Sequence, residues 1–179
     1  MREPGGTSIG EEIRKILLNP ANQEISDVTE FMLYFASRAQ LIKQRVKSAI
    51  SRGEIVLADR YFTSSLVYQG YANNMPLNHI RSLVEIACSD CMFDLALFFD
   101  VPCEIAAKRL GSILDRMEMK GLEFHRMVRQ GYLEVAKQYA DKVRVIDTKS
   151  DVDSVFAKVV GTFESFAAEN NFYEGLRKT

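Results

Sequence analysis

The sequence predicts an α/β fold in which helices pack on a parallel β-sheet. Three short apolar runs rich in strand-forming residues occur at residues 54–58, 95–99 and 143–146, with helical patterns in the intervals between them. Helices that alternate with strands are typical of a parallel sheet, because parallel neighbours need a crossover connection. The first two runs are continuous rather than alternating, as expected for strands buried on both faces.

The helices are predicted from apolar residues that recur at steps of three and four. The longest covers about residues 27–50. Asp27 and Glu30 have the spacing of a capping box at its start, and Gly53 marks its exit. Shorter helices are expected at about residues 8–18, 77–87, 104–110, 118–139 and 152–168.

Length and composition indicate one domain over residues 1–179. Lys plus Arg number 23 against 24 Asp plus Glu, and no basic block marks a surface for a nucleic acid polymer. Any nucleotide ligand is therefore expected to be a small molecule. The chain shows no apolar run of bilayer length and no secretory signal, so we expect no membrane association and a cytoplasmic location.

The cysteines fit a reducing compartment. Cys88, Cys91 and Cys103 cannot all pair internally. Cys88 and Cys91 have the spacing of half a zinc site or of a redox pair, but no second pair follows at a suitable distance. Ordinary, partly buried thiols are the favoured interpretation.

Polar residues follow each apolar run, where ligands of open α/β sheets bind. Asp59 and Arg60 follow the first run, Asp100 the second and Asp147 the third. A carboxylate beside a permanently charged guanidinium suits a metal-bound phosphate and its counter-ion. Asp147 is more simply explained as a solvated strand end. The segment 59–70 adds hydroxyl groups and an amide at the same strand tip.

Two other segments have the chemistry of a nucleotide site. Arg2 precedes a glycine-rich turn that opens a helix, and the backbone amides of such a turn can face an anion. Tyr34 and Arg38 lie four residues apart on the longest helix, so a ring and a guanidinium share one face and suit a planar base. Spacing alone favours the simpler alternative, in which Tyr34 is a core residue and Arg38 a surface ion-pair partner.

Together these segments resemble the thymidylate kinase family. The matching motifs are Arg-Glu-Pro-Gly-Gly-Thr at 2–7, Tyr-Phe-Ala-Ser-Arg-Ala-Gln at 34–40, Asp-Arg-Tyr through Tyr-Gln-Gly at 59–70, Phe-Asp-Val-Pro at 99–102, and Asp-Arg-Met-Glu with Val-Arg-Gln-Gly-Tyr within 115–132. They occur in the family's order and at nearly its spacing, over essentially the whole chain. The resemblance implies a P-loop-kinase-like, three-layer α/β/α fold with a parallel sheet, and a homodimer.

The resemblance also implies a reaction, the transfer of the γ-phosphoryl group of ATP to thymidine monophosphate (dTMP) with Mg²⁺, which gives the diphosphate dTDP. It assigns Tyr34 to the aromatic position that stacks on thymine and Arg38 to the position that reads the edge of the base. Ser65 and Gln69 would complete the base pocket.

The phosphate side of the site is implied in the same way. Arg2 and Arg60 would hold the monophosphate, and Asp59 would lie near the metal and the phosphates. Asp115 and Arg116 would belong to a lid of about residues 109–120 that closes over ATP. Asp59, Arg60 and Arg116 are therefore the catalytic candidates, with Arg116 stabilising charge and Asp59 acting indirectly on the metal.

The sequence departs from the family pattern at its start. Family members have a strand, a P-loop, a helix and a second strand before the Arg-Glu-Pro-Gly-Gly motif, whereas this sequence begins at that motif and contains no Gly-x-x-x-x-Gly-Lys-[Ser/Thr]. We therefore expect a truncated fold that lacks the first two strands and the first helix, with no P-loop to bind ATP. Either the strands at 54–58 and 95–99 close up on one another, or the chain is marginally stable.

Two alternatives to a working thymidylate kinase stay open. One is a catalytically inactive remnant that binds dTMP or forms a homodimer through the helix at 27–50. The other is a kinase for another deoxynucleoside monophosphate.

Overall fold

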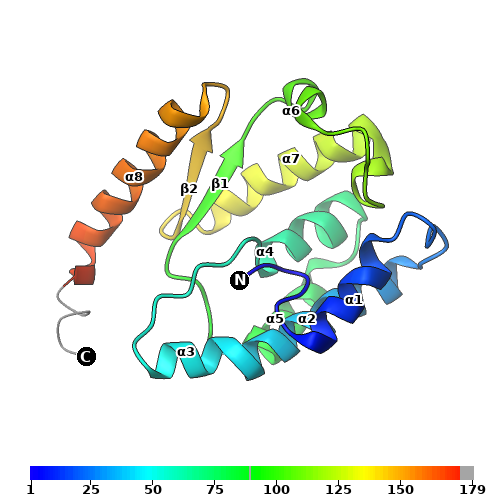
Figure 1. The fold of residues 1–179 in the computed structure, drawn as a ribbon, viewed down its shortest axis with the longest axis horizontal. Helices are drawn as coiled ribbons and strands as arrows, with labels where there is room; N and C mark the ends of the chain where they lie inside the picture. The colour runs from blue at the N-terminus through cyan, green and yellow to red at the C-terminus, as the bar shows by residue number, and fades with distance from the viewer. Residues whose placement is uncertain (89, 174–179) are drawn as a thin grey trace.

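The computed structural model describes residues 1–88 and 90–173 and shows a helix-rich α/β fold with a parallel sheet (Figure 1). This is the fold class that the sequence predicts. In chain order the elements are α1 (Ser8–Leu18), α2 (Asp27–Leu41), the π-helix η1 (Ile42–Val46), α3 (Lys47–Ser51), α4 (Phe62–Ser65), the π-helix η2 (Leu66–Ala72), α5 (Leu77–Cys88), β1 (Ala96–Asp100), α6 (Cys103–Arg109), the 3₁₀ turn η3 (Glu118–Lys120), α7 (Gly121–Gln138), β2 (Val143–Asp147) and α8 (Val152–Glu169).

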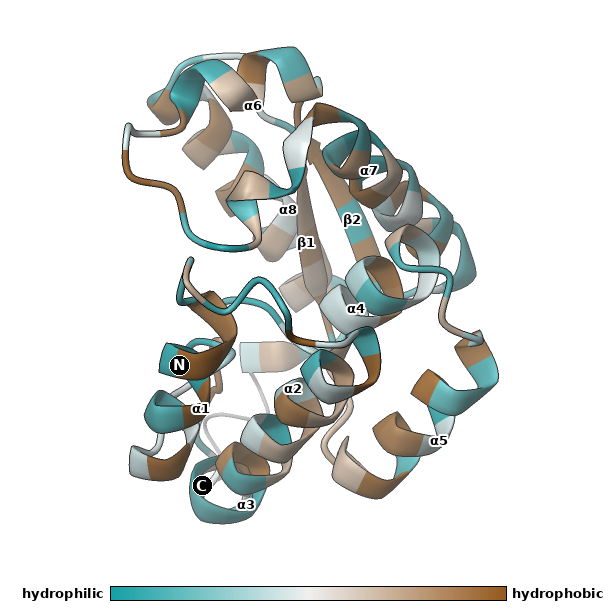
Figure 2. Ribbon diagram, turned by 90° about the vertical axis from the view of Figure 1, so that its right-hand side faces the viewer, coloured by the Kyte–Doolittle hydropathy of each residue, from teal (hydrophilic) through white to brown (hydrophobic). Residues whose placement is uncertain are grey.

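The sheet consists of β1 and β2, which run parallel in a register that pairs Ala96 with Val143 and Asp100 with Asp147. Helix α7 packs against it, with the rings of Phe98 and Tyr132 edge to face at a centroid distance of 4.9 Å. In contrast, the side chain of Phe99 is 59 % exposed. The expectation that residues 95–99 are buried on both faces is therefore wrong. Figure 2 shows both strands with α7 and α8 around them.

Residues 54–58 form no strand, which contradicts the prediction from their apolar run. The segment is extended and leaves Leu57 78 % exposed. Its end pairs with the first residues of the chain, where the Met1 amino group donates to Leu57 O at 2.7 Å and Asp59 N donates to Met1 O at 2.9 Å. A strand needs a continuous ladder of backbone hydrogen bonds, and the described residues supply only this short bridge. Residues 54–58 and β1 do not pair with each other.

The predicted long helix is confirmed as the continuous run of α2, η1 and α3 (Figure 1). The predicted capping box of Asp27 and Glu30 is wrong, because Ser26 caps the helix by accepting a hydrogen bond from Thr29 N at 3.2 Å. The Glu30 side chain points into the protein instead. The other predicted helices are confirmed within a few residues, and α4 with η2 was not predicted.

The core lies between the long helix, α4, η2, α5 and α7, and is built largely from aromatic and aliphatic side chains. Helix α7 approaches η2 closely at Gly131, where an added Cβ atom would lie 2.9 Å from the Cβ of Tyr71. Only glycine fits this contact without displacing η2. The Val-Arg-Gln-Gly-Tyr motif therefore holds α7 against the segment that follows Asp59.

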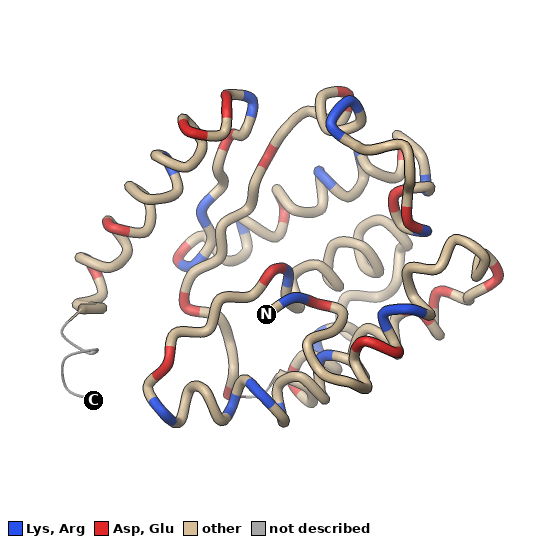
Figure 3. Tube along the Cα trace, in the orientation of Figure 1, with Lys and Arg blue, Asp and Glu red and all other residues tan. Residues whose placement is uncertain are grey.

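Other expectations can be compared with the described residues. No helix among them is both long and apolar enough to cross a membrane. Acidic and basic residues are interspersed along the chain trace (Figure 3).

Cys88, Cys91 and Cys103 are free and buried, and burial raises the pKa of Cys88 to about 11. This agrees with the interpretation of the cysteines as ordinary thiols.

An ion pair joins the end of β1 to α7. Arg129 donates from Nε to Asp100 Oδ1 at 2.6 Å and from Nη2 to Asp100 Oδ2 at 2.8 Å. The Arg129 hydrogen bonds hold the pKa of Asp100 below its usual range, and partial burial opposes this shift. A lowered carboxyl pKa stabilises the fold above the unfolded-state pKa, and this contribution disappears as the pH falls through the folded-state pKa.

We predict that Arg129→Met lowers the free energy of unfolding at pH 7 by about 1 kcal/mol, as for a bidentate pair that is partly exposed. The difference from the wild type should shrink as the pH falls from about 4 through the lowered folded-state pKa, below which Asp100 is protonated in both folded and unfolded chains. Urea unfolding at several pH values measures this. Arg126→Met is the matched control on the same helix, because its partner Glu104 is exposed. A difference independent of pH would contradict the prediction.

Candidate active site

One pocket brings together most of the motifs that the sequence identifies. Its lining comes from the N-terminal loop, α1, α2, the segment 59–69, the segment before α7 and α7 itself, and consists of Glu3, Pro4, Arg14, Leu18, Tyr34, Arg38, Asp59, Arg60, Tyr61, Ser64, Ser65, Tyr68, Gln69, Asp115, Met117, Glu118 and His125. The predicted site residues Tyr34, Arg38, Asp59, Arg60, Ser65, Gln69 and Asp115 are in this set. Arg2 and Arg116 are not.

Arg38 is held rigidly inside the protein. Its side chain is 2 % exposed, so the simpler interpretation of a surface ion-pair partner is wrong. Nε and Nη2 both lie 2.8 Å from Glu3 Oε2, and Nη1 donates to Ser65 Oγ at 3.1 Å. The guanidinium also lies over the Phe35 ring, 4.6 Å from its centroid. These contacts fix a planar donor at the pocket wall.

Glu3 is a site residue that the sequence did not indicate. Burial raises the pKa of its carboxyl group above the usual range, although the charge of Arg38 opposes the shift. Its Oε1 atom is buried and has no hydrogen-bond partner among residues 1–88 and 90–173. One oxygen of the buried Glu3 carboxyl group therefore has no partner among the described residues, while the other holds Arg38.

Arg60 has a strained backbone, with φ at +66°. A residue other than glycine rarely adopts this conformation, and such residues are concentrated at functional sites. Its guanidinium lies 5.0 Å from the centroid of the Tyr68 ring. Tyr34, from α2, lines the same pocket, and burial together with the charge of Glu30 raises its pKa. The Tyr34 hydroxyl is therefore neutral at physiological pH.

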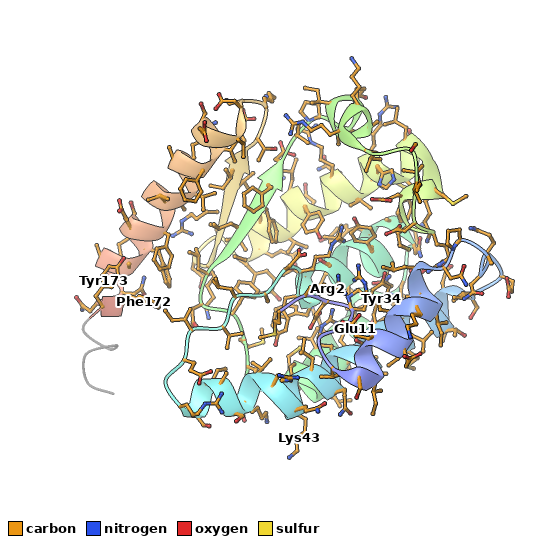
Figure 4. All side chains as sticks on the ribbon, in the orientation of Figure 1. Arg2, Glu11, Tyr34, Lys43, Phe172 and Tyr173 are labelled. Atoms are coloured by element: carbon orange, nitrogen blue, oxygen red, sulfur yellow. The ribbon has the colours of Figure 1, made fainter. Side chains whose placement is uncertain are left out.

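Three glycine amides in and after the glycine-rich turn are bonded to side chains of the protein. Gly5 N donates to Ser37 Oγ at 3.1 Å, Gly6 N to Glu11 Oε1 at 2.8 Å and Gly10 N to Thr7 Oγ1 at 2.9 Å. Arg2 is exposed and pairs with Glu11 Oε2 at 3.1 Å (Figure 4). These three amides are therefore engaged within the protein, and Arg2 lies beside α1 through its pair with Glu11.

The segment before α7, which the sequence assigns to a lid, is tied down at its end. Asp115 Oδ1 accepts hydrogen bonds from Met117 N and Glu118 N, and Glu118 Oε2 accepts one from Asp115 N. Arg116 then points inward and is 4 % exposed. Its Nε donates to Leu17 O at 2.7 Å and its Nη2 pairs with Glu30. The Arg116 guanidinium is thus engaged by Leu17 and Glu30, and Arg116 does not line the pocket.

Glu30 links this segment to Gln69 in the pocket wall. Gln69 donates from Nε2 to Glu30 Oε1 at 2.8 Å. Sequence reasoning placed Glu30 in a helix cap and missed this role, and it also missed Arg14 and Tyr68. Nothing in the local pattern indicates Glu30, because its partners are distant in sequence.

The pocket lacks the grouping expected for a metal centre built by the protein alone. No cluster of three or more His, Cys, Asp or Glu side chains that could hold a metal ion occurs in the part of the chain that the structure describes. Asp59 lines the pocket, so a metal there would need ligands from a bound phosphate.

Planar donors, an aromatic ring and a strained arginine in one pocket of a parallel α/β fold are features that suit the class of nucleotide-binding proteins. The family model for thymidylate kinase matches residues 1–159. The chain is 40 % identical over 167 residues to a thymidylate kinase of Caldanaerobacter subterraneus subsp. tengcongensis, covering 93 % of this chain and 80 % of that protein. It is 39 % identical over 163 residues to one of a Geobacillus species, covering 89 % and 78 %. The chain belongs to the thymidylate kinase family.

A solved structure supports the fold alone. The crystal structure of thymidylate kinase from Ehrlichia chaffeensis superimposes with a TM-score of 0.72 at 24 % identity, over 90 % of this chain and 79 % of that one.

Proposed function

We propose that this protein serves the thymidylate kinase reaction, in which the γ-phosphoryl group of ATP is transferred to dTMP, and that the pocket is its dTMP site. The observation that carries the proposal is the buried set of Arg38, Ser65 and Gln69 beside Tyr34. The edge of thymine presents carbonyl acceptors and an N3–H donor. A fixed guanidinium and an amide can match both, and the Tyr34 ring offers a face for stacking.

The proposed phosphate side is built from Arg60, Asp59 and Arg2. Arg60 lines the pocket and supplies a permanent positive charge for the monophosphate. Arg2 is exposed beside the site, and a phosphate would compete with Glu11 for it. Phosphoryl transfer depends mainly on positioning and charge neutralisation, which these side chains can supply to the acceptor. Asp59 is proposed to act near the phosphates.

The lid is proposed to comprise about residues 109–120, and its closure would exclude water. Because Arg116 pairs with Glu30 here, we propose that it supports catalysis by anchoring this segment. A direct role for Arg116 on the transferred phosphoryl group would require it to leave Glu30.

The described residues do not fit the triphosphate of ATP or its Mg²⁺. The sequence contains no Gly-x-x-x-x-Gly-Lys-[Ser/Thr] motif, and the amides of Gly5, Gly6 and Gly10 are all bonded to side chains. No described residue is therefore assigned to ATP or to the metal. The second candidate function is that these residues bind dTMP without turnover of their own.

Calorimetric titration of the 179-residue chain with dTMP, followed by a coupled assay with ATP and Mg²⁺, tests the proposal. We expect saturable binding of dTMP that is tighter than binding of dCMP. Formation of dTDP would support the kinase, and binding without dTDP would support the second candidate. A chain that is folded by circular dichroism but binds no dTMP would overturn both.

We further propose that the protein forms a homodimer through α2 in the cytoplasm. Val28 and Met32 lie one turn apart on α2 and are both exposed, which suits a helix–helix contact. The three free, buried cysteines are compatible with a reducing compartment.

A further inference from the structure

We infer that Glu30 is a positioning residue that fixes the orientation of the Gln69 side-chain amide and thereby sets the preference of the pocket for a base with an N–H donor on its edge. This inference rests on the proposed function, because it concerns the same base pocket. This preference distinguishes thymine and uracil, which carry a donor at N3, from cytosine, which carries an acceptor there.

The two oxygens of Glu30 have different partners. Oε1 accepts a hydrogen bond from Gln69 Nε2 at 2.8 Å. Oε2 pairs with Arg116 Nη2 and lies 3.8 Å from Lys120 Nζ. The Glu30 side chain is 1 % exposed, so solvent does not replace these contacts. An ionised carboxylate that pairs with two cations can only accept hydrogen bonds.

This restriction determines which end of the Gln69 amide faces the pocket. The NH₂ group must face Glu30, so the carbonyl oxygen Oε1 is left for the pocket that Gln69 lines. The structure records no donor to this oxygen among the described residues. The reversed amide would place the Gln69 side-chain oxygen at hydrogen-bond distance from the Glu30 carboxylate inside the protein. Two acceptors at that distance repel each other. Gln69 is thus preset as an acceptor.

Arg38 supplies the complementary half of the pattern. Glu3 and Ser65 hold its guanidinium, which can only donate. A donor from Arg38 beside an acceptor from Gln69 matches a base edge with a carbonyl oxygen next to an N–H group. Cytosine presents the opposite pattern, with an amino group next to an acceptor nitrogen. Glu30 therefore acts on base choice through Gln69 and without touching the base.

The variant Glu30→Gln tests this, because it keeps the size of the side chain but allows either orientation of Gln69. We measure dissociation constants for dTMP and dCMP by calorimetry. We expect the preference for dTMP over dCMP to fall about tenfold, because a tenfold change in affinity corresponds to the net free energy of one hydrogen bond. Equal weakening of both ligands, with the preference unchanged, would show a merely structural role and overturn the inference.

Lys120→Met is the matched control, since Lys120 approaches only Oε2 of Glu30 and does not contact Gln69. It should leave the preference for dTMP over dCMP unchanged, and a fall as large as that of Glu30→Gln would overturn the inference.

A second measurement on the wild-type chain does not depend on the folding of a variant. In nitrogen-15 NMR spectra, the Gln69 side-chain NH₂ signal, assigned by its loss in Gln69→Glu, should exchange slowly with solvent both without and with dTMP. Fast exchange in the free chain would overturn the role of Glu30. If the wild type binds no dTMP but its Gln69 NH₂ group still exchanges slowly, the orientation of Gln69 by Glu30 stands. Only the proposed function is then overturned.

Discussion

Replacing Arg38 with methionine should lower the free energy of unfolding at pH 7 by about 3–5 kcal/mol, the usual cost of leaving one member of a buried ion pair unpaired. Arg38 holds Oε2 of Glu3, and Glu3 Oε1 already lacks a partner among the described residues. Without the guanidinium, neither oxygen of the buried Glu3 carboxylate would keep a side-chain partner that the structure records. Urea unfolding of the full chain measures the effect.

The double variant Glu3→Gln/Arg38→Met is the control, because it removes both charges. It should recover a large part of the lost stability, and a double variant no more stable than Arg38→Met would contradict the explanation. The pH provides a second check. Burial raises the pKa of Glu3 and Arg38 opposes the rise, so removing Arg38 should raise this pKa further. The penalty exists only while Glu3 is ionised, so the stability lost in Arg38→Met should be regained as the pH falls through the Glu3 pKa of the variant.

Replacing Arg60 with alanine should weaken dTMP binding by about 2–5 kcal/mol, since it removes the charge that we assign to the monophosphate. Each 1.4 kcal/mol corresponds to a tenfold change in the dissociation constant at about 25 °C. Calorimetry with dTMP measures the loss. Arg60→Lys should lose less, because it keeps the charge but not the planar fork.

Thymidine is the matched control ligand for this prediction, because it has the base and sugar without the phosphate. Its affinity should change little in Arg60→Ala. A loss of thymidine binding as large as that of dTMP would show that Arg60 supports the base pocket through Tyr68 and does not hold the phosphate.

Much of the fold could be predicted because helices satisfy their hydrogen bonds locally. The long helix from Asp27 and the final helix from Val152 lie where their apolar periodicity indicates. Strands depend on partners elsewhere in the chain. The runs at 95–99 and 143–146 pair with each other and are confirmed, whereas the equally apolar run at 54–58 finds only a short bridge and stays extended and exposed.

For a similar reason, some residues of the candidate site were predicted correctly and others were not. The family resemblance assigned Tyr34, Arg38, Ser65 and Gln69 to the base pocket, and the structure brings them to one pocket. Arg2 and Arg116 were named as well, but the first pairs with Glu11 and the second faces Glu30. A motif specifies which side chain is present, but not whether that side chain points into the pocket or toward another partner.

The sequence by itself therefore determined the helices, the α/β class, the family and the chemical types gathered at the pocket. Only the tertiary structure decided how the buried charges are matched, namely Glu3 with Arg38 and Glu30 with Arg116 and Gln69. These partners are 35, 86 and 39 residues apart along the chain. A buried charge must be paired wherever the fold brings a partner, so its role is set by packing between distant segments and not by the residues next to it.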